Sequence, residues 1–143
     1  MSKLSERLKE YMEERGLNRV QLARELGIAH TTLCGYLLDK HAPAYPVFVK
    51  LLYQFDCSAD YLLGKDGLHT EERLLPVPPF HERLRCLLNE QGVSQERLKR
   101  ELPVSGSVLY KWTSGKSQPS PETLLRLAEY LDCSVDYLIG RRR

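Results

Sequence analysis

The side chains of this chain that could hold a metal ion or act in catalysis are mainly its four cysteines and four histidines. The cysteines occur singly, at Cys34, Cys57, Cys86 and Cys133. There is no Cys-x-x-Cys pair, no histidine at zinc-ligand spacing, and no histidine that joins a nucleophile and an acid in a recognisable motif. We therefore expect no metal, no cofactor and no enzymatic activity. The cysteines are expected to be reduced and buried in the core.

The overall composition is that of a folded protein with one larger or two small domains. The chain has 143 residues, of which 42% are hydrophobic and 28% charged, and this balance disfavours disorder. It contains no apolar run long enough to span a membrane and no secretory signal, so we expect a cytoplasmic protein. The net charge is only +2, which permits nucleic-acid binding without arguing for it.

Two segments of the chain have nearly the same sequence. Residues 55–64 read FDCSADYLLG and residues 131–140 read LDCSVDYLIG, an offset of 76 residues. The same offset pairs the two halves without a gap as far back as Leu4 and Phe80. We interpret the chain as a duplication of one unit of about 60 residues. The expected organisation is a first copy at 1–64, a linker at 65–79, a second copy at 80–140 and an arginine tail at 141–143.

The segments outside the two copies carry expectations of their own. The linker ends in Pro-Val-Pro-Pro, which disfavours helix and stiffens the chain. Fully extended, it could reach ~50 Å. The three terminal arginines are either a mobile arm that contacts phosphates or a solvated tail.

Each copy shows five short helical patterns, and no segment alternates with the period of a strand. In the second copy, Gly92 is expected to end the first helix in a left-handed cap. Serines are expected to cap the other four helices, at Ser94, Ser105, Ser120 and Ser134. Tyr36 and Trp112, at equivalent positions, are expected in the core. The other predicted core residues of the second copy are Leu84, Leu87, Leu88, Leu98, Leu102, Val108, Leu109, Leu124, Leu125, Ala128, Leu131, Tyr137, Leu138 and Ile139, and those of the first copy are Tyr61, Leu62 and Leu63.

The order of these features resembles a known family. Two short helices are joined by a tight turn, and in the second copy Val-Ser precedes the third helix. A tryptophan, a Gly-Lys pair, a loop proline and the ending Cys-Ser-Val-Asp-Tyr-Leu follow. This set resembles the Cro/repressor (XRE) family of helix-turn-helix proteins, over residues 4–64 and 80–140. The resemblance implies an all-α fold of two tandem five-helix, lambda-repressor-like DNA-binding domains.

The resemblance also implies which residues contact DNA. In that family the third helix enters the major groove and the preceding helix lies across the phosphate backbone. In the second copy the base-contact positions hold Gly106, Ser107 and Lys111, and the backbone-contact positions hold Gln95, Ser105 and Lys116. In the first copy the corresponding sets are His30, Thr31 and Gly35 for bases, and Arg19, Ala29 and Lys40 for the backbone.

The two copies differ in how well these residues could read DNA. Lys111 can donate to guanine O6 and N7, whereas Gly35 offers no group to a base, so the second copy is expected to be the better reader. In the turn before the third helix, Gly27 suits a positive φ that the ring of Pro103 forbids, and the second turn must be built differently. Asp39 replaces Gly115, and the first copy's loop before helix four is expected to differ too.

The expected function is sequence-specific binding of double-stranded DNA by a repressor-like transcriptional regulator. The family often dimerises through its C-terminal end, which implies either an intramolecular pseudo-dimer of the two copies or a homodimer. The alternative is an antitoxin-like or adaptor-like protein-interaction module, in which one or both copies no longer bind DNA. That alternative rests on charge, because the eight basic and eight acidic side chains of residues 1–64 cancel.

Overall fold

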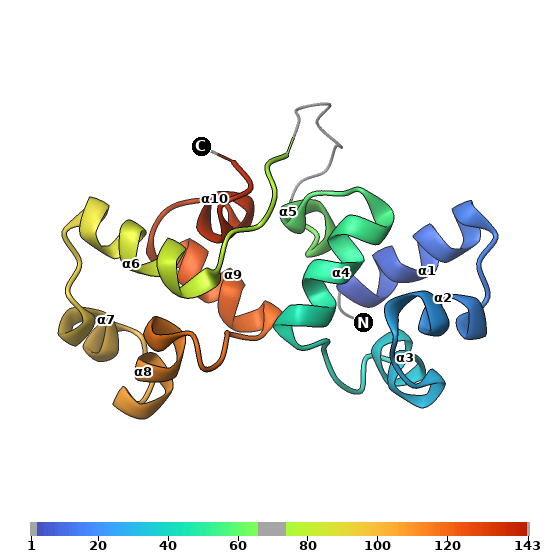
Figure 1. Ribbon diagram of the computed structural model, residues 1–143, viewed down its shortest axis with the longest axis horizontal. Helices are drawn as coiled ribbons and strands as arrows, with labels where there is room; N and C mark the ends of the chain where they lie inside the picture. The colour runs from blue at the N-terminus through green and yellow to red at the C-terminus, as the bar shows by residue number, and fades with distance from the viewer. Residues whose placement is uncertain (1–2, 66–73, 143) are drawn as a thin grey trace. The chain divides into compact units, whose positions relative to one another are not determined.

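The computed structural model describes residues 3–65 and 74–142, and the regular structure in these ranges is entirely helical (Figure 1). The chain divides into two compact units, Met1–Glu71 and Glu72–Arg143. The helices of the first unit are α1 (Lys3–Arg15), α2 (Arg19–Leu26), α3 (His30–Leu37), α4 (Tyr45–Phe55) and α5 (Ala59–Leu62). Those of the second unit are α6 (Phe80–Gln91), α7 (Gln95–Glu101), α8 (Gly106–Ser114), α9 (Pro121–Tyr130) and α10 (Val135–Ile139).

The expected all-α fold with five helices in each copy is therefore confirmed. Residues 66–73 of the predicted linker lie outside the described residues. Within the described part of the chain, no helix is long and apolar enough to cross a membrane.

Four helices of the second unit, α7 to α10, begin directly after the serines that were predicted to cap them. The hydroxyl oxygens of these serines accept the backbone N–H three residues later, at 3.1 Å for Ser94, 3.2 Å for Ser105, 3.3 Å for Ser120 and 3.0 Å for Ser134. Each such cap stabilises its helix by about 1 kcal/mol. In the first unit, the N-cap residues of α3 and α4 are Ala29 and Ala44, and neither alanine offers a side-chain cap.

The turn between the second and third helices differs between the units, as expected. The C-cap residue of α2 is Gly27, whose φ of 69° lets its N–H donate to the carbonyls of Ala23 and Arg24. The C-cap residue of α7 is Leu102, which is extended with φ −103° and ψ 126°. The ring of Pro103 explains the difference, because a residue before proline is driven out of helical conformations.

The loop before the fourth helix changes less than expected. Asp39 and Gly115 are both left-handed, with φ of 60° and 83°. Helices α4 and α9 also begin at equivalent residues, Tyr45 and Pro121. The difference is therefore concentrated at the helix cap, where Ala44 stands in place of Ser120.

The two cores are filled by side chains of different size. In the first unit, the buried rings of Tyr11 and Phe55 stack with their centroids 4.7 Å apart. The equivalent positions of the second unit hold Leu87 and Leu131, both buried. Burial in the first core also raises the pKa of the Tyr11 hydroxyl, because its anion would lose hydration.

Most of the predicted core residues of the second unit are buried, Trp112 included, and so is Tyr36 in the first. Five predictions were wrong: Val108 is 37% exposed. Leu102, Leu125, Tyr61 and Tyr137 are only half-buried. Leu127, which the prediction missed, is fully buried. The core face of α9 consists of Leu124 and the residues three, four and seven positions after it. This spacing includes Leu127 and leaves Leu125 at the edge of the face.

Two further expectations need correction. The four cysteines are free, but only Cys57 is buried, and Cys86 is exposed on α6. Arg141 belongs neither to a mobile arm nor to a solvated tail, because it is only 3% exposed. Its backbone carbonyl accepts the N–H of Leu75 at 2.8 Å, and its Nε donates to the Leu75 carbonyl at 3.4 Å. Arg142 is half-buried, and residue 143 lies outside the described residues.

An arginine in each unit holds the last helix against the first. The guanidinium of Arg83 on α6 lies 4.6 Å from the ring centroid of Tyr137 on α10. Its Nε also donates to the Tyr137 carbonyl at 3.0 Å. In the first unit, Arg7 lies 4.4 Å from the ring of Tyr61. Both tyrosines are half-buried, and each has a guanidinium over one face of its ring.

Candidate nucleic-acid interface

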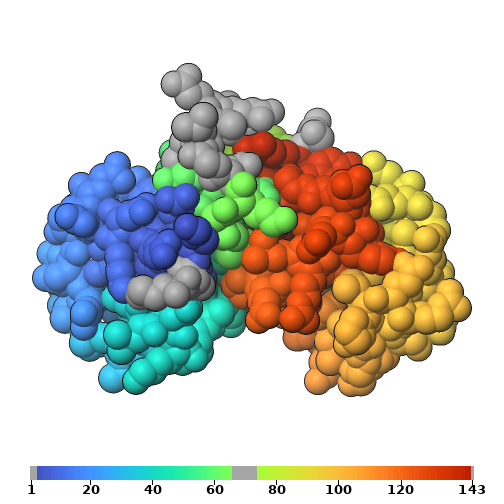
Figure 2. Space-filling view, turned by 180° about the vertical axis from the view of Figure 1, so that it is seen from behind, coloured from blue at the N-terminus to red at the C-terminus, as the bar shows by residue number. Residues whose placement is uncertain are grey.

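The second and third helices of each unit pack together, as α2 with α3 and as α7 with α8. Helix α8 is anchored by Leu109 and Trp112, which are buried. Its opposite face presents Gly106, Ser107 and Lys111 to solvent. The gold and orange atoms of α7 and α8 accordingly lie at the surface of the second unit (Figure 2). The three residues predicted to face bases therefore share one accessible face of one helix.

The predicted backbone contacts of the second unit lie at the ends of the same two helices. Gln95 is the exposed first residue of α7. Ser105 is the N-cap of α8, so its hydroxyl already accepts the N–H of Val108. Lys116 follows α8, and its Nζ lies 5.2 Å from the ring centroid of Tyr110.

A small hollow of about 60 Å³ separates the first turns of α7 and α8. Gln95 and Gly106 both line it, so the structure brings a predicted backbone contact beside a predicted base contact. Lys99 and Tyr110, which the sequence reasoning missed, also line the hollow. Tyr110 is 58% exposed. The sequence signal for Tyr110 was its position four residues after Gly106, which places it on the same exposed side of a short amphipathic helix.

The first unit places its predicted contacts in the same way. His30 and Thr31 are exposed at the start of α3, and Arg19 is exposed at the start of α2. Arg19 Nη1 lies 3.9 Å from the sulfur of Cys34, and His30 Nε2 lies 3.7 Å from the same atom. Lys40 is exposed in the loop after α3. Arg19, a predicted backbone contact, and His30, a predicted base contact, therefore both lie next to the thiol of Cys34.

Gly35 is the exception among the predicted base positions. Its equivalent in the second unit, Lys111, is exposed, but Gly35 itself is buried. Ala29, at the position of Ser105, is exposed and has no hydroxyl with which to bind a phosphate.

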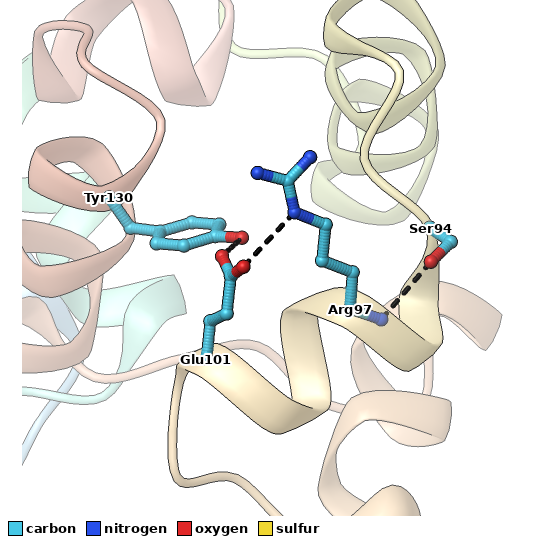
Figure 3. Close-up of polar contacts among 4 residues, drawn as sticks. All are labelled: Ser94, Arg97, Glu101 and Tyr130. Atoms are coloured by element: carbon cyan, nitrogen blue, oxygen red, sulfur yellow. Dashed lines mark hydrogen bonds and ion pairs between the residues drawn. The ribbon is translucent and has the colours of Figure 1, made fainter.

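A polar cluster ties α7 to α9 beside this surface (Figure 3). The Tyr130 hydroxyl donates to the carboxylate of Glu101, and Arg97 Nε donates to the same carboxylate at 3.1 Å. These two contacts lower the pKa of Glu101. In the first unit, Gln54 donates to Glu25, at the same pair of positions. The end of the second helix is thus held to the fourth helix in both units, by a tyrosine in one and a glutamine in the other.

Replacing Glu101 with glutamine is expected to reduce the acid sensitivity of the second unit. A carboxylate whose pKa is lowered by folding stabilises the fold above its usual pKa. That contribution is lost as pH falls through the lowered value. The effect should be small, because Arg97 and Glu101 are exposed and solvent screens them. Urea midpoints measured from neutral pH into acid should therefore fall less for Glu101→Gln than for the wild type, with Glu129→Gln as control. The prediction would be contradicted if the urea midpoint fell equally with pH in the wild type and in both variants.

Comparison with known families agrees with this geometry. One family model, described as helix-turn-helix, matches residues 84–138, and a second, described as helix-turn-helix domain, matches residues 5–68. The chain belongs to the helix-turn-helix proteins of the Cro/repressor type, with two tandem copies of the domain. The resemblance stated from the sequence is thereby confirmed.

Curated relatives carry the same domain. The chain is 33% identical over 61 residues to the HTH-type transcriptional activator BcrR of Enterococcus faecalis, which is 43% of this chain and 30% of that protein. It is 36% identical over 63 residues to the HTH-type transcriptional regulator ImmR of Bacillus subtilis (strain 168), covering 44% of this chain and 50% of that protein. The chain thus spans half or less of the length of these relatives. No solved structure matches it significantly.

Proposed function

We propose that this protein binds double-stranded DNA in a sequence-specific manner and regulates transcription, with the third helix of each domain in the major groove. The observation that carries the proposal is the division of α8 into two faces. Leu109 and Trp112 fix the helix to the core, while Ser107 and Lys111 stay exposed on the other side. A helix held in this way can enter a groove without losing its own packing.

The proposed contacts divide into bases and phosphates. The base-contact residues are Gly106, Ser107 and Lys111 in the second domain and His30 and Thr31 in the first. The phosphate-contact residues are Gln95, Ser105 and Lys116 in the second domain and Arg19 and Lys40 in the first. A lysine can donate hydrogen bonds to guanine, and a serine hydroxyl can either donate to a base or accept from one. A helix N-terminus such as that of α7 attracts a phosphate through its free N–H groups.

The experiment that tests the proposal is selection of bound duplexes from a random DNA pool, followed by affinity measurement at increasing salt. We expect a defined motif, and a binding constant that falls steeply with salt because each neutralised phosphate releases counterions. A chain that enriches no sequence and binds duplex only weakly would contradict the proposal. That result would favour a protein-interaction module instead.

A further inference from the structure

The first domain lacks a side chain at the position that Lys111 occupies in the second domain. That position holds Gly35, and it is buried although its equivalent is exposed. The group that covers Gly35 is the imidazole of His41, from the loop after α3. A Cβ atom added to Gly35 would collide with Cε1 and Nε2 of that ring. In the first domain, the ring therefore lies at the position that corresponds to the Cβ atom of Lys111 in the second domain.

The backbone explains why His41 reaches this place. In the first domain the N–H of Lys40 donates to the carbonyl of Gly35 at 2.9 Å. In the second domain the N–H of Lys116 donates to the carbonyl of Lys111, also at 2.9 Å. The turn after the third helix thus closes with the same hydrogen bond in both domains, although in the second domain the N–H of Ser117 also donates to the Lys111 carbonyl, at 3.2 Å. His41 and Ser117 follow that turn at equivalent positions, and the short serine side chain leaves Lys111 exposed.

A neighbouring ring holds the imidazole in position. Tyr36 meets His41 edge to face, with the ring centroids 5.2 Å apart and an interplanar angle of 82°. Tyr36 is itself buried in the core of the first domain. His41 remains exposed to solvent, so its ring is oriented by the core but open to a ligand.

We propose that His41, held over Gly35, reads the base pair of the first half-site that corresponds to the one facing Lys111 in the second half-site. This inference rests on the proposed function. A lysine can only donate hydrogen bonds, whereas an imidazole carries both a ring N–H and an acceptor nitrogen when neutral. The two domains therefore prefer different bases at this position. The chain recognises a DNA site with two different half-sites, rather than the two matching half-sites that identical domains would select.

The test is DNA selection with the full chain and three variants. His41→Ala is expected to lose its preference at one or two base pairs of the first half-site and to bind the wild-type site about tenfold more weakly, as for the loss of one base contact. Gly35→Ala is expected to lose preference at the same base pairs, because its Cβ displaces the imidazole. Ser117→Ala is the matched control and should select the wild-type site. Circular dichroism establishes that each variant is folded.

The outcomes separate this inference from the proposed function. A wild-type chain that enriches no motif overturns the proposed function and this inference with it. A wild-type motif with two identical half-sites overturns the inference alone. So does a folded His41→Ala variant that selects the wild-type first half-site with unchanged preference.

Discussion

Replacing Ser107 and Lys111 together with alanine is expected to lower the affinity of the protein for its selected DNA site on the order of 10²-fold. The reason is that both side chains face solvent on α8 and are proposed to meet base edges. Each good base contact contributes about 1–3 kcal/mol of discrimination. Affinity for unrelated duplex should fall much less, because phosphate contacts carry most non-specific binding. Competition titrations with the selected site and a scrambled site measure both quantities.

The control for the double variant is Arg126→Ala. It also removes one positive charge from the second unit, but on the exposed surface of α9, outside the helix-turn-helix pair. It should keep the ratio of the two affinities. A double variant that kept this ratio as well would refute the assignment of Ser107 and Lys111, even if DNA binding itself were intact.

Replacing Trp112 with alanine is expected to destabilise the second domain by about 3–5 kcal/mol, the usual cost of deleting a large buried aromatic side chain. Trp112 is 5% exposed and lies on the core face of α8, which packs against α6. A domain of about 70 residues has a stability of similar size, so much of the second domain should be unfolded in this variant. The first unit has its own core and should keep its unfolding transition.

Urea denaturation followed by far-UV circular dichroism measures this effect. Trp112 is the chain's single tryptophan, so wild-type tryptophan fluorescence identifies which step of the transition belongs to the second domain. The control is Tyr110→Ala on the same helix, whose side chain is 58% exposed. It should change stability by less than about 0.5 kcal/mol. A loss below about 1 kcal/mol for Trp112→Ala would show that α8 is not anchored as described.

Local signals predicted most of the fold. The four serine caps of the second unit, the left-handed glycine at Gly92 and the five-helix pattern depend on residues close in sequence. The altered turn at Pro103 followed from the geometry of proline alone. One error, at Leu125, was a matter of local helical spacing, and others lay where a residue's surroundings come from distant segments. Arg141, for example, is covered through its contacts with Leu75.

The candidate site was predictable only in part, for the same reason. The resemblance identified which positions of the third helix would contact bases. It could not indicate that a loop histidine covers Gly35, because that contact depends on the turn after α3 and on the ring of Tyr36. The resemblance assigns no role to Tyr110, although Tyr110 lines the same hollow as Gln95 and Gly106.

The different sizes of the two cores have a consequence for how a duplicated chain folds. Tandem domains of similar sequence can exchange equivalent segments and become trapped in hybrid structures. A hybrid that placed Tyr11 against Leu131 would leave the tyrosine without its stacking partner. One that placed Leu87 against Phe55 would leave a void, at about 24 cal/mol for each Å³. The aromatic pair in one core and the leucine pair in the other therefore make such hybrids less stable than the native pairing of the segments.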